Sequence, residues 1–444
     1  MLAPVRALDV RNTGMRHGFA GYVRSAISGG GGTDSNMVER KSAIEPVIRP
    51  LPGFAGMMRH AFGHNLVNGF SAFLFAATGP GAMILAVGAA ASLPGDVIAA
   101  WLFAAYALSG VLSIGVCYLY RQPLTIGYSM PGVVIVGPAL MHFSMPELVG
   151  AYLVTGGLIL LLAVTGLIRR VTAALPEPII MAMVAGVFLP YGMRMIGAFE
   201  TSIWMAGSMV AGYLAVTAIP TIRRRFPPVL AALLAGSITI VATGAFGPTG
   251  DMALQIAEPI VFRPEFTLSA IIELVIPLTV TVVGIHNTQG FAIARNAGYR
   301  PPENMATLLC GSGTIVYGLL GCVPTVVTAP ANAILNVSGD PAWRYVGGIW
   351  FGIFILVFGI LAPTAVQVGM ALPSAFIATL AGLAMIPVLQ SAFVSGFGGK
   401  FTLGALVTFL ITVAGVSILG IGAAFWGLVF GYAVSRIAER DDFG

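Results

Sequence analysis

The sequence is interrupted in the same way at two places, Tyr128-Ser129-Met130-Pro131-Gly132 and Val327-Thr328-Ala329-Pro330-Ala331. Each interruption sets a small hydroxyl residue and then a proline inside a hydrophobic segment, and a short apolar run follows. Proline is tolerated in the first turn of a helix but breaks a helix interior. Each interruption therefore predicts a strand-like lead into a half-length helix. Paired broken helices in corresponding places of two halves of a membrane protein indicate a transporter binding site.

The composition also indicates a membrane protein. The chain has 444 residues, of which 57% are hydrophobic and 9% charged, and its mean hydropathy is +0.92. These values exclude an ordinary soluble domain, and repeated long apolar runs predict an all-α polytopic membrane protein. Cys117, Cys310 and Cys322 lie in apolar segments without CxxC spacing. They predict neither a metal site nor a disulfide framework.

Apolar runs separated by turns predict 14 spans. A full span needs about 20 residues, and the third and tenth runs are shorter, as broken segments should be. The approximate cores are 66–90, 97–118, 123–141, 147–168, 174–192, 201–220, 228–246, 268–292, 304–321, 324–338, 343–362, 370–389, 402–417 and 419–437.

The distribution of basic residues predicts the topology. With the N-terminus in the cytoplasm, 20 of the 22 Lys and Arg residues fall on the cytoplasmic side, and only Arg194 and Arg263 fall outside. This bias is typical of bacterial inner membrane proteins and predicts cytoplasmic N- and C-termini. The net charge of +5 thus reflects topology, and no nucleic acid partner is expected. Residues 1–62 hold many arginines and no long apolar run, which predicts a disordered cytoplasmic tail.

Seven spans in each half predict an inverted repeat. Ser129-Met130-Pro131 pairs with Thr328-Ala329-Pro330 at an offset of 199 residues, and Leu175-Pro176 pairs with Leu372-Pro373 at an offset of 197. In such a repeat the two short helices run in opposite directions, so their N-termini can face one another near the bilayer midplane.

Two facing helix N-termini predict a cradle for a carboxylate or a polar ring. Each offers unpaired N–H groups and favours an anion by about 0.3–1 kcal/mol. Ser129 and Thr328 add hydroxyl groups, and Gly132, Ala331 and Asn332 are the expected N–H donors because proline has none. The alternative, two proline kinks in ordinary helices, leaves the paired positions unexplained. The predicted substrate-binding residues at the breaks also include Tyr128, Met130 and Ala329.

The eighth span carries polar residues in the run Gly284-Ile285-His286-Asn287-Thr288-Gln289-Gly290. Polar side chains inside lipid are costly unless they face a cavity or the bundle interior. His286 is the candidate for proton coupling because its ordinary pKa lies near 6.5, and Asn287 is a candidate wall residue. The alternative for His286 is a structural hydrogen bond between helices.

The first span offers Phe73 and Thr78 as further substrate-binding candidates. An aromatic pair contributes about 0.5–1.5 kcal/mol beyond burial, which suits an aromatic substrate. Packing against lipid or core is the alternative for any one phenylalanine. No HExxH, GxSxG or P-loop motif occurs, so neither an enzyme nor an ATP-driven pump is predicted, and no cofactor is expected.

Four stretches resemble the benzoate membrane transport (BenE) family. They are the third-span motif Tyr128-Ser129-Met130-Pro131-Gly132, the run from Leu175-Pro176 through Ala185-Gly186, the run from Asn287 through Ala297-Gly298-Tyr299, and Gly420-Ile421-Gly422-Ala423-Ala424-Phe425-Trp426-Gly427-Leu428. The resemblance covers about residues 64–438. The family is related to nucleobase–cation symporters and sulfate permeases.

The resemblance implies 14 spans as two inverted sevens, with half-helices in spans 3 and 10. Spans 1–4 and 8–11 would form a core domain, spans 5–7 and 12–14 would form a gate domain, and substrate would sit between the two breaks. The implied activity is uptake of benzoate or a similar aromatic carboxylate with a proton, by alternating access, in a homodimer. The implied boundaries are 1–62 for the tail, 63–170 and 267–366 for the core, and 171–266 and 367–444 for the gate.

The chain departs from the nucleobase branch, which carries glutamates in spans 8 and 10. The corresponding runs here are Gly284-Ile285-His286-Asn287 and Thr328-Ala329-Pro330-Ala331-Asn332. The lack of a carboxylate suits an anionic substrate but leaves two proton carriers open, His286 or the ligand as a neutral acid. Other solutes, such as sulfate, bicarbonate or a nucleobase, and a passive anion channel remain alternatives.

Overall fold

The computed structural model describes residues 45–47, 50–51, 53–165, 176–223, 226–245, 247, 254–336, 338–415, 418 and 423–443. Some sequence-based predictions lie outside the described residues. These are the tail up to residue 44, the arginines at 169–170 and 224–225, Leu175 of the second repeat match, and residues 420–422 of the last family-like stretch.

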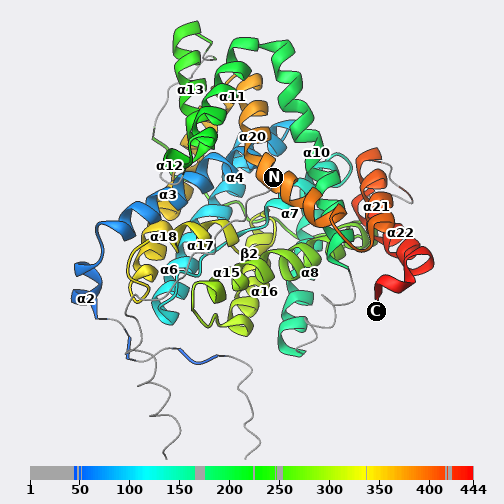
Figure 1. Cartoon of the computed structure of the whole chain (residues 1–444), viewed down its shortest axis with the longest axis horizontal. Coiled ribbons are helices and arrows are strands. Elements are labelled where there is room, and N and C mark those ends of the chain that lie inside the picture. The colour runs from blue at the N-terminus through cyan, green and yellow to red at the C-terminus, as the bar shows by residue number, and fades with distance from the viewer. Residues whose placement is uncertain are drawn as a thin grey trace, which may run out of the picture. The chain divides into compact units, whose positions relative to one another are not determined.

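The described part of the chain is mostly helical (Figure 1). The elements of its first half are α2 (Phe54–Arg59), α3 (His64–Thr78), α4 (Pro80–Ala90), α5 (Gly95–Phe103), the π-helical turn η1 (Ala104–Leu108), α6 (Ser109–Tyr120), β1 (Ile126–Tyr128), α7 (Met130–Ala139), α8 (Met145–Thr165), α10 (Glu177–Thr201), α11 (Ile203–Ala218), α12 (Pro220–Arg223) and α13 (Pro228–Thr243).

The second half follows a similar order. Its elements are α14 (Leu268–Thr279), the π-helical turn η2 (Val280–Asn287), α15 (Thr288–Asn296), α16 (Glu303–Leu319), β2 (Thr325–Val327), α17 (Ala329–Leu335), α18 (Arg344–Ile360), α19 (Ala362–Ala371), α20 (Ser374–Phe397), α21 (Thr402–Ala414), α22 (Ala423–Ala438) and the 3-10 turn η3 (Arg440–Phe443). At least one described helix overlaps each predicted span core, and a strand precedes the short helix of the third and the tenth.

Six helical stretches are long and apolar enough to cross a membrane by length and composition. A seventh is added if α18 and α19, which meet at a bend of 68°, form one span. The six are His64–Ala90, Gly95–Tyr120, Met145–Thr165, Glu177–Thr201, Leu268–Asn296 and Ser374–Phe397. Helices α7, α11, α13, α21 and α22 are apolar but shorter, so length and composition alone give fewer spans than the 14 predicted.

The two strands pair with each other at the centre of the helices. They are antiparallel, Ile126 lies opposite Val327 and Tyr128 lies opposite Thr325, and all six strand residues are buried. Proline at the second position of α7 and of α17 fixes where each helix begins. The chain therefore enters both helices from extended backbone.

Side chains of neighbouring helices complete the hydrogen bonds of the strands. Ser113 on α6 accepts a bond from the backbone N–H of Ile126 at 2.9 Å, and Thr314 on α16 accepts one from Thr325 at 3.1 Å. A backbone N–H in the membrane interior must find such a partner inside the protein. The hydroxyl residues of these helices therefore satisfy N–H groups of the buried strands.

Small residues allow close packing of the helix pairs. Gly110 on α6 faces Gly352 on α18, and a Cβ added to Gly110 would lie 2.5 Å from the carbonyl oxygen of Gly352. Gly156 on α8 meets α16 in the same way, since its added Cβ would lie 2.9 Å from the carbonyl oxygen of Gly311. Both contacts require glycine.

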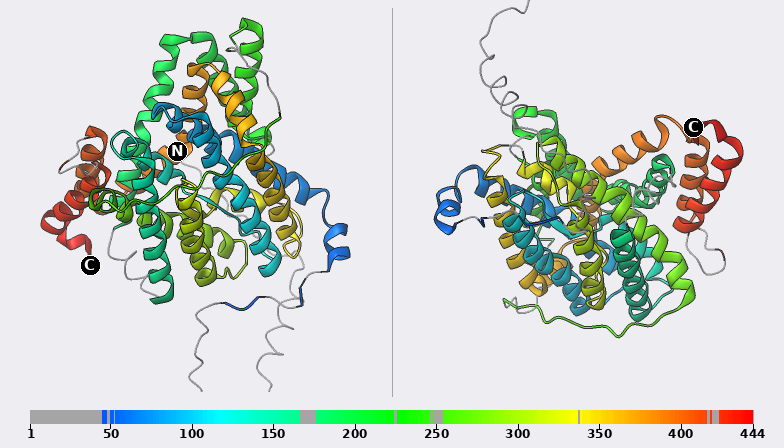
Figure 2. Two further views of the ribbon diagram at one scale, coloured as in Figure 1. Left: turned by 180° about the vertical axis from the view of Figure 1, so that it is seen from behind. Right: turned by 90° about the horizontal axis from the view of Figure 1, so that it is seen from below.

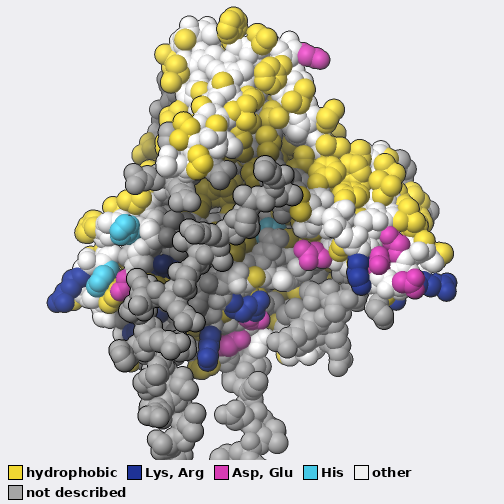
Figure 3. All heavy atoms as spheres, viewed as in Figure 1, with side chains coloured by type: hydrophobic (Ala, Val, Ile, Leu, Met, Phe, Trp, Pro, Cys, Tyr) yellow, Lys and Arg dark blue, Asp and Glu magenta, His cyan; other side chains and the backbone are white. Residues whose placement is uncertain are grey.

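A second group of helices packs around α10. Helix α10 runs along α20 and also contacts α21 and α22, and α11 packs on α13. Helices α21 and α22 lie side by side in both views of Figure 2. Apolar side chains cover the surface over α11 and α13 in Figure 3, and Trp204, Ile238 and Val241 are strongly exposed there. Such a surface suits contact with lipid.

The structure differs from the sequence prediction at the end of the tail. Residues 54–59 form α2, and Glu45 accepts hydrogen bonds from the backbone N–H groups of Asn304 and Met305. A carboxylate at the N-terminus of a helix is stabilised by the unpaired N–H groups there. Glu45 thus binds the first turn of α16, and His60, just after α2, stacks on Trp343. The structured part of the chain therefore begins earlier than predicted.

Candidate functional site

A cavity of about 350 Å³ lies beside β1 and the starts of α7 and α17. Helices α3, α4, α6, α10, α15, α18 and α20 and the π-helical turns complete its wall. Among the described lining residues, none is Lys, Arg, Asp or Glu. Its lining includes Phe75, Ala76, Pro80, Tyr106, Ser109, Tyr128, Met130, Met181, Val184, His286, Gln289, Thr328, Ala329, Ala331, Phe351, Val388 and Ser391.

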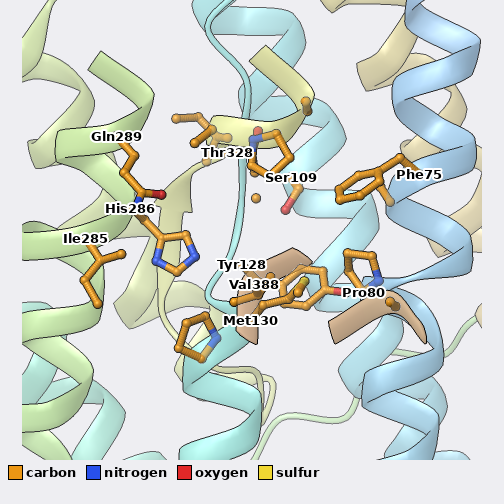
Figure 4. Close-up of a pocket in the computed structure, with 18 of the residues that line it drawn as sticks. Phe75, Pro80, Ser109, Tyr128, Met130, Ile285, His286, Gln289, Thr328 and Val388 are labelled. Atoms are coloured by element: carbon orange, nitrogen blue, oxygen red, sulfur yellow. The ribbon is translucent and has the colours of Figure 1, made fainter. Parts of the chain in front are cut away.

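The cavity has a polar side and an apolar side (Figure 4). His286 and Gln289 extend into it from η2 and α15, and Phe75 and Pro80 face them from α3 and α4. Ligand pockets commonly combine apolar walls with a few polar groups, and the volume lies within their usual range of about 300–1,000 Å³. The arrangement can hold an apolar ring with one polar group.

The side chain of Ser129, the residue just before α7, caps the N-terminus of this helix. Ser129 is fully buried, and its Oγ accepts a hydrogen bond from the backbone N–H of Gly132 at 3.0 Å. The same oxygen lies 3.3 Å from the Oγ1 of Thr281 on η2. Neither Ser129 nor Gly132 lines the cavity, whereas Met130 does, and its N–H has no partner among the described residues.

The start of α17 is built differently. The Oγ1 of Thr328 lies 2.5 Å from that of Thr125, which donates in turn to the Oδ1 of Asn332. Thr328 therefore donates to Thr125 and does not cap the helix. Ala329 and Ala331 line the cavity, and their N–H groups have no partner among the described residues. Among the described lining residues, Met130 and Tyr128 likewise have N–H groups without a partner, so these four residues can supply backbone donors.

The ring of His286 lines the cavity in a fixed tautomer. Its Nδ1 lies 2.9 Å from the backbone carbonyl oxygen of Thr281. A carbonyl only accepts, so Nδ1 carries the hydrogen in the neutral ring. The Nε2 atom can then only accept. It becomes a donor once the ring takes up a second proton.

Asn287 and Asn332 hold the strands and do not line the cavity. The Oδ1 of Asn287 accepts a bond from the N–H of Val327 at 3.0 Å, and the Oδ1 of Asn332 accepts one from the N–H of Thr125 at 2.8 Å. Both side chains are almost fully buried. Each side chain therefore satisfies a buried backbone N–H at the paired strands and holds that part of the chain in place.

The two candidates from the first span also lie outside the lining. Phe73 packs against Phe354 and Phe358 of α18, with ring centroids 5.7 and 5.9 Å apart. Thr78 donates to the carbonyl oxygen of Leu74 one turn earlier, at 2.7 Å. Of the predicted site residues, the cavity brings together Tyr128, Met130, His286, Thr328, Ala329 and Ala331.

Several lining residues were not identified from the sequence. Tyr106 and Ser109 come from the second span, where nothing marks them apart from other small or aromatic residues. Pro80 follows Gly79 within a predicted span, and such a break could have indicated the cavity. Met181 and Val388 lie on α10 and α20 and give no local signal at all.

The fold is similar to that of two solved structures. The chain is similar to "The overall structure of SLC26A9" with a TM-score of 0.59 and 13% identity, over 84% of this chain and 64% of that one, which is less than two thirds of its length. It is similar to "The transmembrane domain of a cyanobacterium bicarbonate transporter BicA" with a TM-score of 0.56 and 14% identity, over 84% of this chain and 97% of that one.

Sequence comparison gives the family. The chain is 28% identical to "Inner membrane protein YdcO" of Escherichia coli (strain K12), over 85% of this chain and 97% of that protein. It is 27% identical to "Benzoate membrane transport protein" of Acinetobacter baylyi, over 82% of this chain and 92% of that protein. The profile of the benzoate membrane transport protein family matches residues 61–437. The chain therefore belongs to the benzoate membrane transport protein (BenE) family, whose members are membrane transporters.

Proposed function

We propose that this protein imports benzoate or a similar aromatic monocarboxylate together with a proton, by alternating access in the bacterial inner membrane. The observation that carries the proposal is the fixed tautomer of His286 at a cavity whose described lining has no Lys, Arg, Asp or Glu. A carboxylate there meets a donor from His286 only when the ring is protonated. Anion and proton then bind together.

The electrical balance favours the same coupling. Moving one negative charge into a negative-inside cell costs about 2.3 kcal/mol per 100 mV. One accompanying proton removes this cost, whether it travels on His286 or on the acid itself. The N–H groups of Met130, Ala329 and Ala331 supply neutral donors for the carboxylate oxygens.

Pseudo-equivalent contacts support 14 spans arranged as an inverted repeat. The bond of Ser113 to Ile126 in the first half matches that of Thr314 to Thr325 in the second. Helix α3 packs on α18 while α14 packs on α8, and α6 packs on α18 while α16 packs on α8. Such crossed pairing of the halves is expected when spans 1–4 and 8–11 interlock. The helices α7 and α17 then serve as the half-helices of spans 3 and 10.

The position of the cavity supports alternating access. Its wall takes His286 and Thr328 from the proposed core (63–170 and 267–366) and Met181 and Val388 from the proposed gate (171–266 and 367–444). A shift of one group of helices against the other would open the cavity to either side. We further propose cytoplasmic termini and a homodimer, as the family resemblance implies.

Uptake by proteoliposomes tests the function. We expect labelled benzoate to accumulate when the outside is acidic, external alkalinisation to accompany uptake, and a protonophore to abolish accumulation. Accumulation that a protonophore leaves unchanged would contradict the coupling.

A competition panel tests the substrate class. Unlabelled benzoate should compete with the labelled acid, whereas uracil, sulfate and bicarbonate should not. Competition by uracil alone would point to a nucleobase carrier. Large single-channel currents without uphill accumulation would point to an anion channel.

A further inference from the structure

Tyr106 and Tyr128 line one side of the cavity, next to a helix break where a backbone hydrogen-bond donor is missing. Pro80 has no N–H, so the carbonyl oxygen of Ala76, four residues earlier, lacks its usual helical partner. The hydroxyl of Tyr106 donates to this oxygen at 2.6 Å. Gly81 leaves room for the hydroxyl, because an added Cβ would lie 3.0 Å from it. The break between α3 and α4 therefore fixes the direction of the Tyr106 O–H bond.

The direction of that bond decides what Tyr128 can do. A tyrosine hydroxyl has a single hydrogen. The hydroxyl oxygens of Tyr106 and Tyr128 lie 2.9 Å apart, and the hydrogen of Tyr106 is already used by Ala76. Tyr128 must therefore donate to Tyr106. Its own oxygen keeps free lone pairs and can only accept from a ligand.

The hydroxyl hydrogen of Ser109, on the same side of the cavity, is also already used in a hydrogen bond within the protein. Its Oγ donates to the carbonyl oxygen of Ala105 at 2.5 Å and lies 2.7 Å from the hydroxyl of Tyr317, which donates to it. The three hydroxyl residues that line this side, Tyr106, Tyr128 and Ser109, thus offer a ligand no hydrogen. A carboxylate gains nothing here, whereas a ligand O–H finds an acceptor.

The size of the cavity leaves room for a substituted ring. An engineered apolar cavity of about 150 Å³ is enough to hold benzene. The cavity here measures about 350 Å³, more than twice as much. Benzoate alone would leave part of the space unfilled.

We propose that the cavity takes ring-hydroxylated aromatic carboxylates, with the carboxylate toward His286 and the ring hydroxyl donating to the Tyr128 oxygen. This inference rests on the proposed function, and it names the substrate class of the same site. It predicts that a ring hydroxyl is favoured over a ring ether oxygen, which can only accept a hydrogen bond.

Calorimetric titration of the purified full-length protein tests the inference. The probes are benzoate, 3- and 4-hydroxybenzoate, and 3- and 4-methoxybenzoate, whose methoxy oxygen has no hydrogen to donate. We expect at least one hydroxybenzoate to bind roughly 2- to 10-fold more tightly than its methoxy counterpart, as one neutral hydrogen bond allows. Equal affinity within both pairs, or a preference for methoxy, overturns the inference without any variant.

Two variants locate the effect at the tyrosine pair. Tyr128→Phe should bring the ratio of methoxy to hydroxy dissociation constants to about 1. Tyr106→Phe frees the hydrogen of Tyr128, so this ratio should fall below the wild-type value as methoxy binding improves. Tyr213→Phe on α11, outside the cavity, is the matched control and should keep the wild-type ratio.

The outcomes separate this inference from the proposed function. Benzoate binding with no hydroxyl preference overturns the inference and leaves the proposed function in place. A hydroxyl preference that survives in Tyr128→Phe overturns the inference as well. If none of the aromatic acids binds the wild-type protein, both the inference and the proposed function are wrong.

Discussion

The Nδ1 atom of His286 lies 2.9 Å from the backbone carbonyl oxygen of Thr281, five residues earlier in the chain. Both residues belong to the π-helical turn η2, which brings a carbonyl five residues back within reach of the ring. Such π-helical turns are rare in proteins, and many of those that do occur are found at functional sites. The contact leaves Nε2 of His286 as the ring atom that can meet a ligand.

The first prediction concerns His286 itself. His286→Gln keeps a polar side chain but cannot take up a proton at neutral pH. We expect accumulation of benzoate driven by an inward pH gradient to fall by about 10-fold or more, the scale of a hydrogen bond to a charged group. Uptake of labelled benzoate by proteoliposomes, with a fluorescent pH indicator in the external solution, measures the benzoate flux and the proton flux together.

The control for this variant is His64→Gln, at the exposed first residue of α3. It should accumulate benzoate as the wild type does. Wild-type accumulation and wild-type alkalinisation in His286→Gln would contradict the role of this ring and leave the neutral acid as the proton carrier.

The second prediction concerns the cap of α7. Ser129→Ala leaves the N–H of Gly132 without its acceptor, which should lower the free energy of unfolding by about 1 kcal/mol. Ser129→Thr keeps the hydroxyl oxygen, so its free energy of unfolding should fall by less than that of Ser129→Ala. Thermal unfolding in detergent, followed by intrinsic fluorescence, measures the difference, and equal melting temperatures for all three proteins would argue against the cap.

The third prediction concerns the contact between α6 and α18. Gly110→Ala would set a Cβ 2.5 Å from the carbonyl oxygen of Gly352, and the helices must move apart to accept it. Overpacking of this kind costs about 1–3 kcal/mol. Gly115→Ala is the matched control on the same helix, because nothing lies within 4 Å of its added Cβ. Similar unfolding temperatures for the two variants would contradict the packing.

The fourth prediction concerns pH and the end of the chain. Partial burial raises the pKa of Glu439, but hydrogen bonds from Ser435, Gly404 and Leu403 outweigh it, so the pKa lies below its ordinary value. The carboxylate thus stabilises the start of α21 fully above the unfolded pKa of about 4.3. This contribution is lost as the pH falls through the folded pKa.

The variant Glu439→Gln should remove this part of the pH dependence. Hydrogen exchange of the Leu403 and Gly404 amides, measured between pH 6 and pH 3, is a local readout. The wild type should lose protection as the pH falls, and Glu439→Gln should start with less protection and change less. Asp441→Asn, at an exposed site, should behave as the wild type. Protection in the wild type that stays constant to pH 3 would contradict the assignment.

Much of the local fold at the breaks could be predicted from the sequence. Pro131 and Pro330 fix where two short helices begin, and the β-branched run from Thr325 to Val327 favours extended backbone before one of them. These signals are local, so a single sequence carries them. The π-helical turns could not be predicted in this way, because neither has a marker comparable to proline.

The site itself was only partly predictable. A polar residue in a span was expected to meet substrate, but Asn287 and Asn332 instead satisfy the backbone of the crossing strands. The need arises from the strands themselves, since their N–H groups are buried and require a partner inside the protein. The role of Tyr106 depends on a carbonyl freed by Pro80. Such pairings between distant segments have no signature in one sequence.

The most direct test of the account is a structure with a heavy-atom ligand, 4-iodobenzoate, bound at saturating concentration. We predict density for the ring inside the cavity, with the carboxylate against Nε2 of His286 and the N–H groups of Ala329 and Ala331 and the iodine on the side of Tyr128. Ligand density only outside this cavity, for example in the apolar groove of Phe393, Phe397 and Phe409, would contradict the assignment of the site.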